Sequence, residues 1–446
     1  MGCSLPECDC RVLSEREPGR WSELRQWTNA LRHAGVAIVM PTDWRSLLWG
    51  LVVIVAACGG GIGVATEGPE LTTTTTETAV TSTRPTSTDS AGVLPEGPSA
   101  LTDLGNSALP PPLVDASEII SGGPPPDGIP PIDNPVFIGV EEADAWLEDG
   151  EPVVYLEIGG EAHAYPVQVL IWHEIVNDTV GGVPVSITYC PLCNSAVSYR
   201  RVINGVETTF GTSGMLYASA LVMYDRATES LWTHFDGRAV AGVLTGEQLE
   251  PIASPLLAWA DFVAAYPDGR VLDREATGHS RPYGSNPYSG YDNPDAFPFL
   301  FRGTVDERTA AMQRVVGVAL DGAAVAFTLE AISGDSVRAT MATVGNDPIV
   351  VFWRSGQSSA LDTAKIDEGR DVGSVGVFSP LVDGQTLTFR VEDGTFVDDQ
   401  TGSTWDITGR AGSGALAGTS LPQIHHLDTF WFAWATYQPN SELVTG

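Results

Sequence analysis

The stretch SITYCPLCNSAVSYRR, residues 186–201, places two cysteines between two segments in which apolar and polar side chains alternate. Alternation with a period of two is typical of a strand with one buried face. Pro191 restricts the backbone of the connection, and Asn194 is the commonest residue other than glycine at a position with positive φ. The sequence therefore predicts two strands joined by a tight turn that holds Cys190 and Cys193.

Similar short alternating segments recur along the chain, separated by turn signals. The pairs Gly-Gly at 181–182 and Asn-Gly at 204–205 are typical of two-residue hairpin turns. Two aromatic segments, LLAWADFVAAYP (256–267) and FWFAWATYQP (430–439), have the pattern of amphipathic helices that end before a proline. We therefore expect an α+β fold of mostly antiparallel strands with a few short helices.

A weak internal duplication divides the part that is expected to fold. VVYLEIGGEAHAYPVQVL (153–170) aligns without a gap with VVGVALDGAAVAFTLEAI (315–332). This similarity predicts two degenerate repeats, built from the same strands and turns. They comprise residues 132–280 and 302–446, and a Tyr- and Pro-rich loop, 281–301, joins them.

The duplication separates residues that occur twice from residues that occur once. Asp225 and Trp232 correspond to Asp398 and Trp405, which favours a structural role for them. The ungapped offset places different residue types opposite the other candidates: Phe352 opposite Cys190, Ser355 opposite Cys193 and Asp335 opposite His173. The sequence therefore predicts one cysteine site, in the first repeat.

The N-terminal region contains an export signal. Arg45 precedes an apolar run, 47–57, that is shorter than the roughly 20 residues of a spanning helix and has the flanks of a signal peptide. The run ends in Val-Ala-Ala-Cys, which resembles the lipobox of bacterial lipoproteins. That resemblance implies a lipidated Cys58 and an exported protein anchored to the outer face of the cell membrane. An ordinary signal peptide and an uncleaved anchor are the alternatives.

The segments beside this signal are not expected to fold. Residues 1–39 precede the signal peptide, 40–57, and we interpret them as a misassigned extension, with translation starting at Met40. Residues 58–131 are rich in Thr, Ser, Gly and Pro and poor in large apolar side chains. Such a segment buries too little apolar surface to offset its chain entropy, so we expect a disordered tether.

The charge excludes one class of partner. The formal net charge is −33, and residues 1–39 contribute five Arg against five acidic residues, so the exported part carries the excess. Because no basic patch is visible, a nucleic-acid partner is not expected. The membrane, reached through the lipid anchor, is the expected contact, and the sequence identifies no small-molecule or protein partner.

The cysteine pair has four interpretations: a disulfide, a redox dithiol, half of a metal site, or two small core residues. A thioredoxin-type dithiol lies at a helix N-terminus, whereas Cys190 and Cys193 lie between strands. No histidine follows Cys193 directly, so covalent haem attachment is not indicated. The Cys-Pro-Leu-Cys-Asn turn resembles the metal knuckle of rubredoxins and zinc ribbons, in which a closed zinc site needs four ligands.

Few side chains can complete such a metal site. His173, in the helical pattern VLIWHEIVNDT that we expect to end near Asn177, is the first candidate ligand. Thiolates with His and Met suit copper(I), and thiolates with two His suit zinc. Each candidate also has an ordinary structural interpretation, since a lone His is commonly hydrogen-bonded in a core and a strand Met commonly packs there. The weaker candidates are His234, Met215, Met223, His425 and His426.

The segments AYPVQVLIWHEIVNDTVGGVPVSITYCPLC, TFGTSGMLYASALVMYDRATESLWTHFDGRAVAG and RPYGSNPYSGYD together resemble the prokaryotic family designated domain of unknown function thirty-one seventy-nine. The resemblance covers about residues 132–446 and implies no particular activity. It marks a set of pattern residues without giving them roles: His173, Glu174, Cys190, Cys193, Asp225, Arg226 and Trp232.

Three functions remain open from the sequence. The leading hypothesis is a soft-metal site that binds copper or zinc, and whether it is catalytic is left open. The alternatives are an exported thiol–disulfide protein and a binding module with structural cysteines. In the last case the loop 281–301 performs the recognition, with Arg281 and Tyr283 facing the cysteines, or else it only packs between the repeats.

Overall fold

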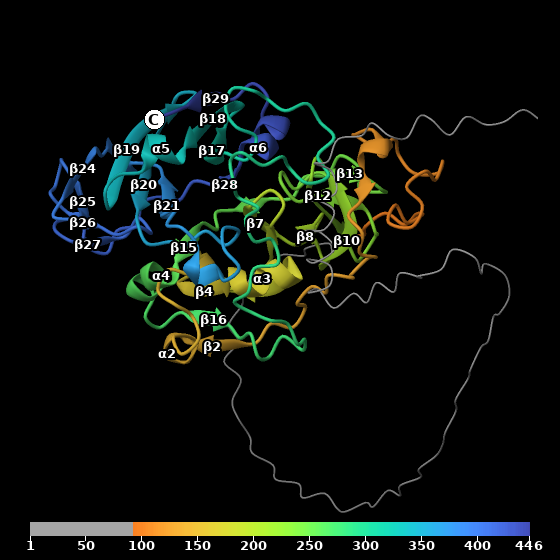
Figure 1. The fold of residues 1–446 in the computed structure, drawn as a ribbon, viewed down its shortest axis with the longest axis horizontal. Coiled ribbons are helices and arrows are strands. Elements are labelled where there is room, and N and C mark those ends of the chain that lie inside the picture. Colours follow the sequence, from red (N-terminus) through yellow and green to blue (C-terminus); the bar gives the residue numbers. More distant parts are fainter. Residues whose placement is uncertain (1–91) are drawn as a thin grey trace, which may run out of the picture. The chain divides into compact units, whose positions relative to one another are not determined.

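The computed structural model describes residues 92–446, which lie within one unit of the chain. The predictions for the extension, the signal peptide, Cys58 and residues 58–91 of the tether lie outside this described part. The described chain is built from short, mostly antiparallel strands and a few short helices, which confirms the predicted α+β class (Figure 1).

One sheet of the first half carries the helix that precedes the cysteine hairpin. Its central strands β3 and β4 form an antiparallel hairpin, and β4 also pairs in parallel with β16. The strands in spatial order are β15 (Leu256–Ala258), β3 (Pro152–Ile158), β4 (Glu161–Pro166), β16 (Arg270–Leu272) and β2 (Phe137–Gly139). The helices are α2 (Val140–Ala143), α3 (Val167–His173) and α4 (Trp259–Ala265).

A second sheet contains the cysteine hairpin, and the strand–turn–strand prediction is confirmed. Cys190 ends one strand and pairs with Ser195 at the start of the next. Asn194 has a φ of 51°, as expected from its place in the turn. The strands in spatial order are β14 (Pro251–Ile252), β7 (Ser195–Arg200), β6 (Val183–Cys190) and β5 (Ile175–Val180).

The helix before this hairpin is shorter than predicted. The expectation that it ends near Asn177 is wrong, because α3 ends at His173 and β5 begins at Ile175. Glu174 lies between them with a φ of 59°, outside the helical region. The β-branched residues that follow favour a strand, and the Gly-Gly turn at 181–182 therefore joins β5 to β6.

A third sheet incorporates part of the segment that was expected to be disordered. Strand β1 pairs with β10, and Ala100, Leu101 and Ile119 are buried against this sheet. The tether prediction is therefore wrong for residues 100–131, because the sheet supplies the apolar surface that the segment lacks. The elements are the 3-10 helix Ala116–Glu118, β1 (Ile120–Ser121), β10 (Phe210–Tyr217), β11 (Ala220–Asp225), β12 (Leu231–Thr233) and β13 (Ala239–Ala241).

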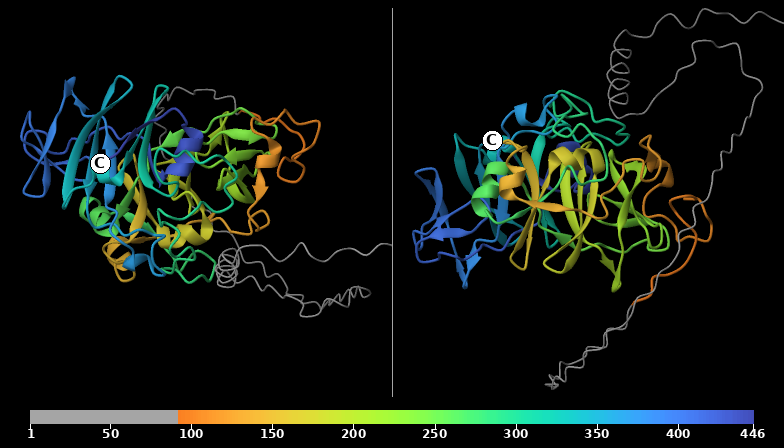
Figure 2. Two further views of the ribbon diagram at one scale, coloured as in Figure 1. Left: turned by 45° about the horizontal axis from the view of Figure 1, so that its top comes forward. Right: turned by 90° about the horizontal axis from the view of Figure 1, so that it is seen from below.

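The second half contains sheets with corresponding strand orders, drawn in teal and blue in Figure 2. In the first of them β17 and β18 form a hairpin, and β18 pairs in parallel with β29. Its elements are β28 (His426–Phe430), β17 (Arg314–Leu320), β18 (Ala323–Thr328) and β29 (Glu442–Val444), with helices α5 (Leu329–Ile332) and α6 (Trp431–Tyr437). The other strands are β19 (Val337–Val344), β20 (Asp347–Arg354), β21 (Ser374–Phe378), β24 (Phe389–Glu392), β25 (Thr395–Asp398), β26 (Thr404–Trp405) and β27 (Ala411–Ser413).

Three small elements complete the described chain. The Asn-Gly pair at 204–205 forms a tight turn with positive φ at both residues, as its sequence predicts. The elements are the hairpins β8 (Val202–Ile203)–β9 (Val206–Glu207) and β22 (Leu381–Val382)–β23 (Gln385–Thr386), and the 3-10 helix Ile366–Glu368.

The two halves share a hydrophobic core. Tyr155 and Phe262 of the first half belong to the same buried cluster as Phe352 and Trp405 of the second. Strand β28 also lies beside β7, so that the second half reaches the cysteine hairpin (Figure 1). The cysteine turn is therefore held between elements that are far apart in the sequence.

Candidate functional site

Cys190 and Cys193 are reduced and enclosed, with 1% and 0% of their surfaces exposed. The sulfur of Cys190 accepts a hydrogen bond from the backbone N–H of Leu221 on β11, at 3.4 Å. Strand β6 ends at Cys190, and the next three residues turn the chain so that Cys193 lies beside it. The two sulfurs therefore form one buried dithiol, with β11 covering one side.

The two thiols have opposite tendencies to ionise. Burial alone would raise the pKa of Cys190, but hydrogen bonds from Cys193 and from backbone N–H groups outweigh it and lower this pKa. Burial and the neighbouring Cys190 raise the pKa of Cys193 well above its ordinary value. The arrangement therefore favours a thiolate at Cys190 and a thiol at Cys193.

A chain of hydrogen bonds leads from Cys193 into the interior. The sulfur of Cys193 lies 2.9 Å from Oγ of Ser195, and this Oγ lies 2.9 Å from Nε2 of His234. Nδ1 of His234 lies 2.8 Å from Oγ1 of Thr188, which donates to the carbonyl oxygen of Val197 at 2.6 Å. His234, a weaker metal candidate from the sequence, is therefore linked to the cysteines through a hydroxyl.

The directions of these hydrogen bonds follow from the last one. Because the single proton of the Thr188 hydroxyl goes to a carbonyl, Thr188 must accept from Nδ1–H of His234. Nε2 of His234 is then a lone-pair acceptor for the hydroxyl of Ser195, which can in turn accept the thiol proton of Cys193. Burial lowers the pKa of His234 to about 3, which agrees with a neutral ring.

Sequence reasoning missed Ser195 and Thr188, although a signal was present. Alternation along a strand puts Thr188 on the same face as Cys190, and a tight hairpin puts Ser195 opposite Cys190. Register within the predicted hairpin would therefore have marked both hydroxyls as neighbours of the cysteines.

The other predicted ligand, His173, is buried and has different partners. Its Nδ1 lies 2.7 Å from the carbonyl oxygen of Pro130, and its Nε2 lies 2.7 Å from the hydroxyl of Tyr283. Burial lowers the pKa of His173 to about 4, so the ring is neutral near pH 7. Both nitrogens of His173 are therefore engaged away from the sulfurs, and Tyr283 lies beside His173.

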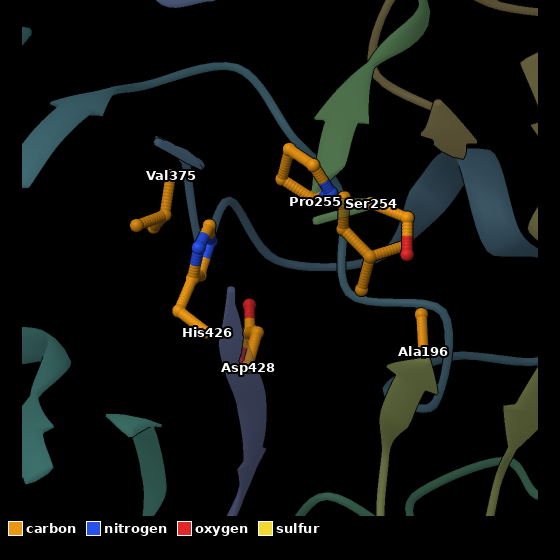
Figure 3. A pocket seen from close by; sticks show the side chains of 7 residues that line it. Ala196, Ser254, Pro255, Val375, His426 and Asp428 are labelled. Carbon is orange, nitrogen blue, oxygen red and sulfur yellow. The ribbon is translucent and has the colours of Figure 1, made fainter. Parts of the chain in front are cut away.

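The remaining metal candidates occupy other positions in the structure. Met223 is buried in β11 between Thr212 and Trp232 of the neighbouring strands, and Met215 packs against the apolar cluster of the third sheet. His426 bonds through Nδ1 to the carbonyl of Ile424, at 2.9 Å. Figure 3 shows a small cavity that His426 lines together with Asp428, Ser254, Pro255, Val375 and Ala196. His425, the residue before His426, is also buried, and this burial lowers the pKa of His425 to about 4.

Three other pattern residues make structural contacts. Asp225 accepts hydrogen bonds from the backbone N–H and the hydroxyl of Thr228, at 2.7 and 2.9 Å, and from the indole of Trp232, at 3.0 Å. Arg226 pairs with Asp133 at 2.7 Å and with Asp127 at 3.3 Å, and so fixes the segment that contains these two aspartates. These contacts give Asp225, Arg226 and Trp232 structural roles that do not involve the cysteines.

The same hydrogen bonds recur in the second half. Asp398 accepts from the backbone N–H and hydroxyl of Thr401, at 2.6 and 2.8 Å, and from the indole of Trp405, at 3.1 Å. The corresponding part of that half contains no cysteine, so these hydrogen bonds do not depend on the dithiol.

Comparison with known proteins gives a family. Residues 126–441 match the family described as Protein of unknown function (DUF3179). The chain belongs to this family. No curated protein and no solved structure matches the chain. The DUF3179 match includes the dithiol, His234, His173 and the loop 281–301, whereas residues 92–125 precede it.

The tyrosine-rich loop of this DUF3179 domain covers the cysteine turn. The hydroxyl of Tyr291 donates to the carbonyl of Leu192 at 3.1 Å, and its ring packs edge-on against Phe430.

Burial raises the pKa of Glu174 well above its ordinary value, and the nearby Cys190 adds to this effect. Arg281 has a buried Nε with no hydrogen-bond partner among the described residues. The loop therefore contacts the cysteine turn through Tyr291, and His173 through Tyr283.

Residues 92–446 contain neither a ready-made metal cluster nor a membrane-spanning helix. Within this range no cluster of three or more His, Cys, Asp or Glu side chains has the arrangement of a metal site. None of the helices in the same range combines the length and the apolar composition needed to cross a bilayer.

Proposed function

We propose that Cys190 and Cys193 form a thiol–disulfide redox centre. The observation that carries this proposal is the pair of adjacent reduced thiols with opposite pKa shifts, Cys190 lowered and Cys193 raised. A thiolate is the nucleophile in thiol–disulfide exchange, so Cys190 is the attacking residue and Cys193 the resolving one. Because both sulfurs are enclosed in the reduced protein, the exchange requires a local opening that admits the partner disulfide to Cys190.

The reaction exchanges two thiols for one disulfide. The Cys190 thiolate attacks a disulfide of a partner molecule, forms a mixed disulfide and releases one partner thiolate. Cys193 then loses its proton and attacks the sulfur of Cys190, which breaks the mixed disulfide and releases the second partner thiolate. Two cysteine thiols are oxidised and one partner disulfide is reduced, so atoms and electrons balance.

The test is alkylation followed by mass analysis. After incubation with oxidised glutathione, the wild-type protein should lose two hydrogen atoms and resist alkylation at both positions. Cys193→Ser should instead stop at a mixed disulfide on Cys190. Two freely alkylated cysteines at every ratio of oxidised to reduced glutathione would contradict the proposal.

A soft-metal function is the second candidate, because the same two sulfurs form a ligand pair. Thiolates select copper(I) and zinc, and the pKa of Cys190 already favours its ligand form. Zinc needs four ligands, so copper(I) requires fewer additions to this pair. Anaerobic titration with copper(I) against a chromophoric chelator tests the idea. Equal copper binding by wild type and by a Cys190→Ser/Cys193→Ser double variant would exclude it.

We also propose that the protein is exported and anchored through Cys58. The short apolar run and its Val-Ala-Ala-Cys ending support this location, where a disulfide could persist. Mass analysis of the mature N-terminus tests the proposal. A lipid-modified Cys58 is the expected first residue, and a mature chain that retains Trp49 would contradict it.

We infer that residues 132–280 and 302–446 are degenerate copies. The support is the shared strand order of β15-β3-β4-β16 and β28-β17-β18-β29, together with the parallel pairing of the last two strands in each. The matching contacts of Asp225 and Asp398 agree with it. On this view the redox centre belongs to the first copy.

A further inference from the structure

We propose that His234 accepts the proton of Cys193 through the hydroxyl of Ser195 while the disulfide closes. This inference rests on the proposed redox function, because it assigns a proton acceptor to the second half of the exchange. Ser195 is the proton carrier in this step, and Thr188 is a positioning residue that fixes the tautomer of His234.

The geometry supplies an unbroken path for the proton. Successive heavy atoms lie 2.9 Å apart from Cys193 Sγ to Ser195 Oγ, and again 2.9 Å apart from Ser195 Oγ to His234 Nε2. In the reduced protein the thiol of Cys193 also donates to the sulfur of Cys190, but in the mixed disulfide that sulfur is bonded to the partner and is no longer an anion. The other acceptor, the carbonyl of Cys190, lies farther away, at 3.8 Å. The shorter route leads to a ring nitrogen that carries a lone pair.

The step is balanced. As Sγ of Cys193 bonds to Sγ of Cys190, the bond from Cys190 to the partner sulfur breaks and the partner leaves as a thiolate. The Cys193 proton moves to Ser195, and the Ser195 proton moves to Nε2 of His234. The imidazolium then gives this proton to the released partner thiolate, which leaves as a thiol and returns His234 to its neutral form.

Burial gives a reason for an internal acceptor. The hydrogen-bonded chain is as buried as the sulfurs, since none of the surface of Ser195, His234 or Thr188 is exposed. In the reduced protein the Cys193 thiol is therefore shielded from bulk water. The high pKa of Cys193 further disfavours spontaneous loss of the proton.

Other titratable groups near His234 have different roles. Tyr199 donates its hydroxyl to the backbone carbonyl of His234 at 2.8 Å, and the pKa of Tyr199 is raised by burial. Tyr437 is also buried. Burial raises its pKa, and the nearby Asp236 and Cys193 add to this effect. Asp236 accepts hydrogen bonds from Thr233 and from the backbone N–H of Arg238, and Cys190 is consumed as the disulfide forms. Within the described chain, His234 alone is hydrogen-bonded to Ser195 through a lone pair.

The proposal predicts a distinctive pH profile. Because burial keeps His234 neutral down to about pH 4, closure in the wild type should vary little from about pH 5 to about pH 8. Without the relay, closure must wait for ionised Cys193, and its rate should rise about tenfold per pH unit.

The experiment measures closure from a preformed mixed disulfide between Cys190 and a small aromatic thiol, in the full mature chain. Ser195→Ala and His234→Gln should each slow closure by about a hundredfold near pH 6, as expected for loss of general base catalysis. Ser195→Thr retains a hydroxyl and should restore most of the rate. His163→Gln is the matched control, since His163 is another buried histidine of the same half, bonded to Asp178 and Glu161.

The outcomes separate the two proposals. If the wild type never forms the disulfide, the proposed function is wrong. If it closes, but Ser195→Ala and His234→Gln close at the same rate with the same pH profile, only the relay is wrong. Should either variant fail to fold, the solvent deuterium isotope effect on wild-type closure decides. Two moving protons predict a reduced rate in D₂O, and an unchanged rate would overturn the relay.

Discussion

The backbone N–H of Phe430 donates to the carbonyl oxygen of Cys193 at 3.0 Å, so a residue of the second half closes the cysteine turn of the first. The hydroxyl of Thr429 donates to the same oxygen at 2.7 Å. The second half therefore has no dithiol of its own but fixes the position of Cys193. Changes in β28 should alter the reactivity of the cysteines without touching either sulfur.

Thr429→Val should loosen the cysteine turn. The substitution removes one of two hydrogen bonds to the carbonyl of Cys193 while keeping the shape of the side chain. We expect a loss of about 1 kcal/mol in the free energy of unfolding and faster alkylation of the thiols. Urea unfolding and timed alkylation measure both. Thr436→Val is the control, because the hydroxyl of Thr436 donates to the carbonyl of Phe432 within α6 and, among residues 92–446, makes no hydrogen bond to the cysteine turn.

Tyr283→Phe and Tyr437→Phe should have opposite effects on stability. The hydroxyl of Tyr283 bonds to His173 at 2.7 Å and to Thr277 at 2.8 Å, so its removal should cost about 1 kcal/mol and make the loop 281–301 more sensitive to protease. The hydroxyl of Tyr437 is buried without a hydrogen-bond partner among residues 92–446. Removing it should leave stability unchanged or raise it. A loss in Tyr437→Phe as large as that in Tyr283→Phe would contradict the difference expected between these two hydroxyls.

Stability should decrease in mild acid because of the buried histidines. Burial lowers the pKa of His173 to about 4 and that of His234 to about 3, whereas an unfolded histidine titrates near 6.5. The unfolded chain then binds protons that the folded chain excludes. The contribution of these groups is complete above about pH 6.5 and is lost as the pH falls toward their folded pKa values.

Urea unfolding at several pH values measures this dependence. Each histidine should contribute up to about 1.4 kcal/mol per pH unit within the window. His173→Gln should reduce the slope between about pH 6.5 and about pH 5. An identical slope in this variant would mean that His173 binds its proton equally in both states.

Asp225→Asn and Asp398→Asn should destabilise the protein to a similar extent. Each aspartate accepts three matching hydrogen bonds from a Thr and a Trp, so the replacement leaves buried donors poorly paired. We expect losses of about 1–3 kcal/mol. Alkylation rates of the folded variants should match the wild type, and a large change confined to Asp225→Asn would assign that residue to the cysteine site.

The hairpin and its turn followed from local sequence. Alternation on both sides of the cysteines predicted β6 and β7, and the positive φ of Asn194 followed from its residue type. Local patterns sufficed because a two-strand hairpin is specified by its own residues and its turn.

Other features depend on contacts that a sequence pattern does not contain. Leu101 and Ile119 become ordered only because a distant sheet covers them, so composition alone suggested a tether. His173 was placed with the cysteines by proximity along the chain, yet its side chain binds Pro130 and Tyr283. The direction in which a side chain points at a helix end depends on its tertiary neighbours. The hydrophobic periodicity of the sequence contains no information about those neighbours.

The most direct test of the account is an equilibrium redox titration of the mature protein, with the state of Cys190 and Cys193 read by mass analysis. The account predicts a single two-electron transition between a dithiol and an intramolecular disulfide, abolished by Cys190→Ser or Cys193→Ser. Two cysteines that remain thiols from reducing to strongly oxidising conditions would contradict it.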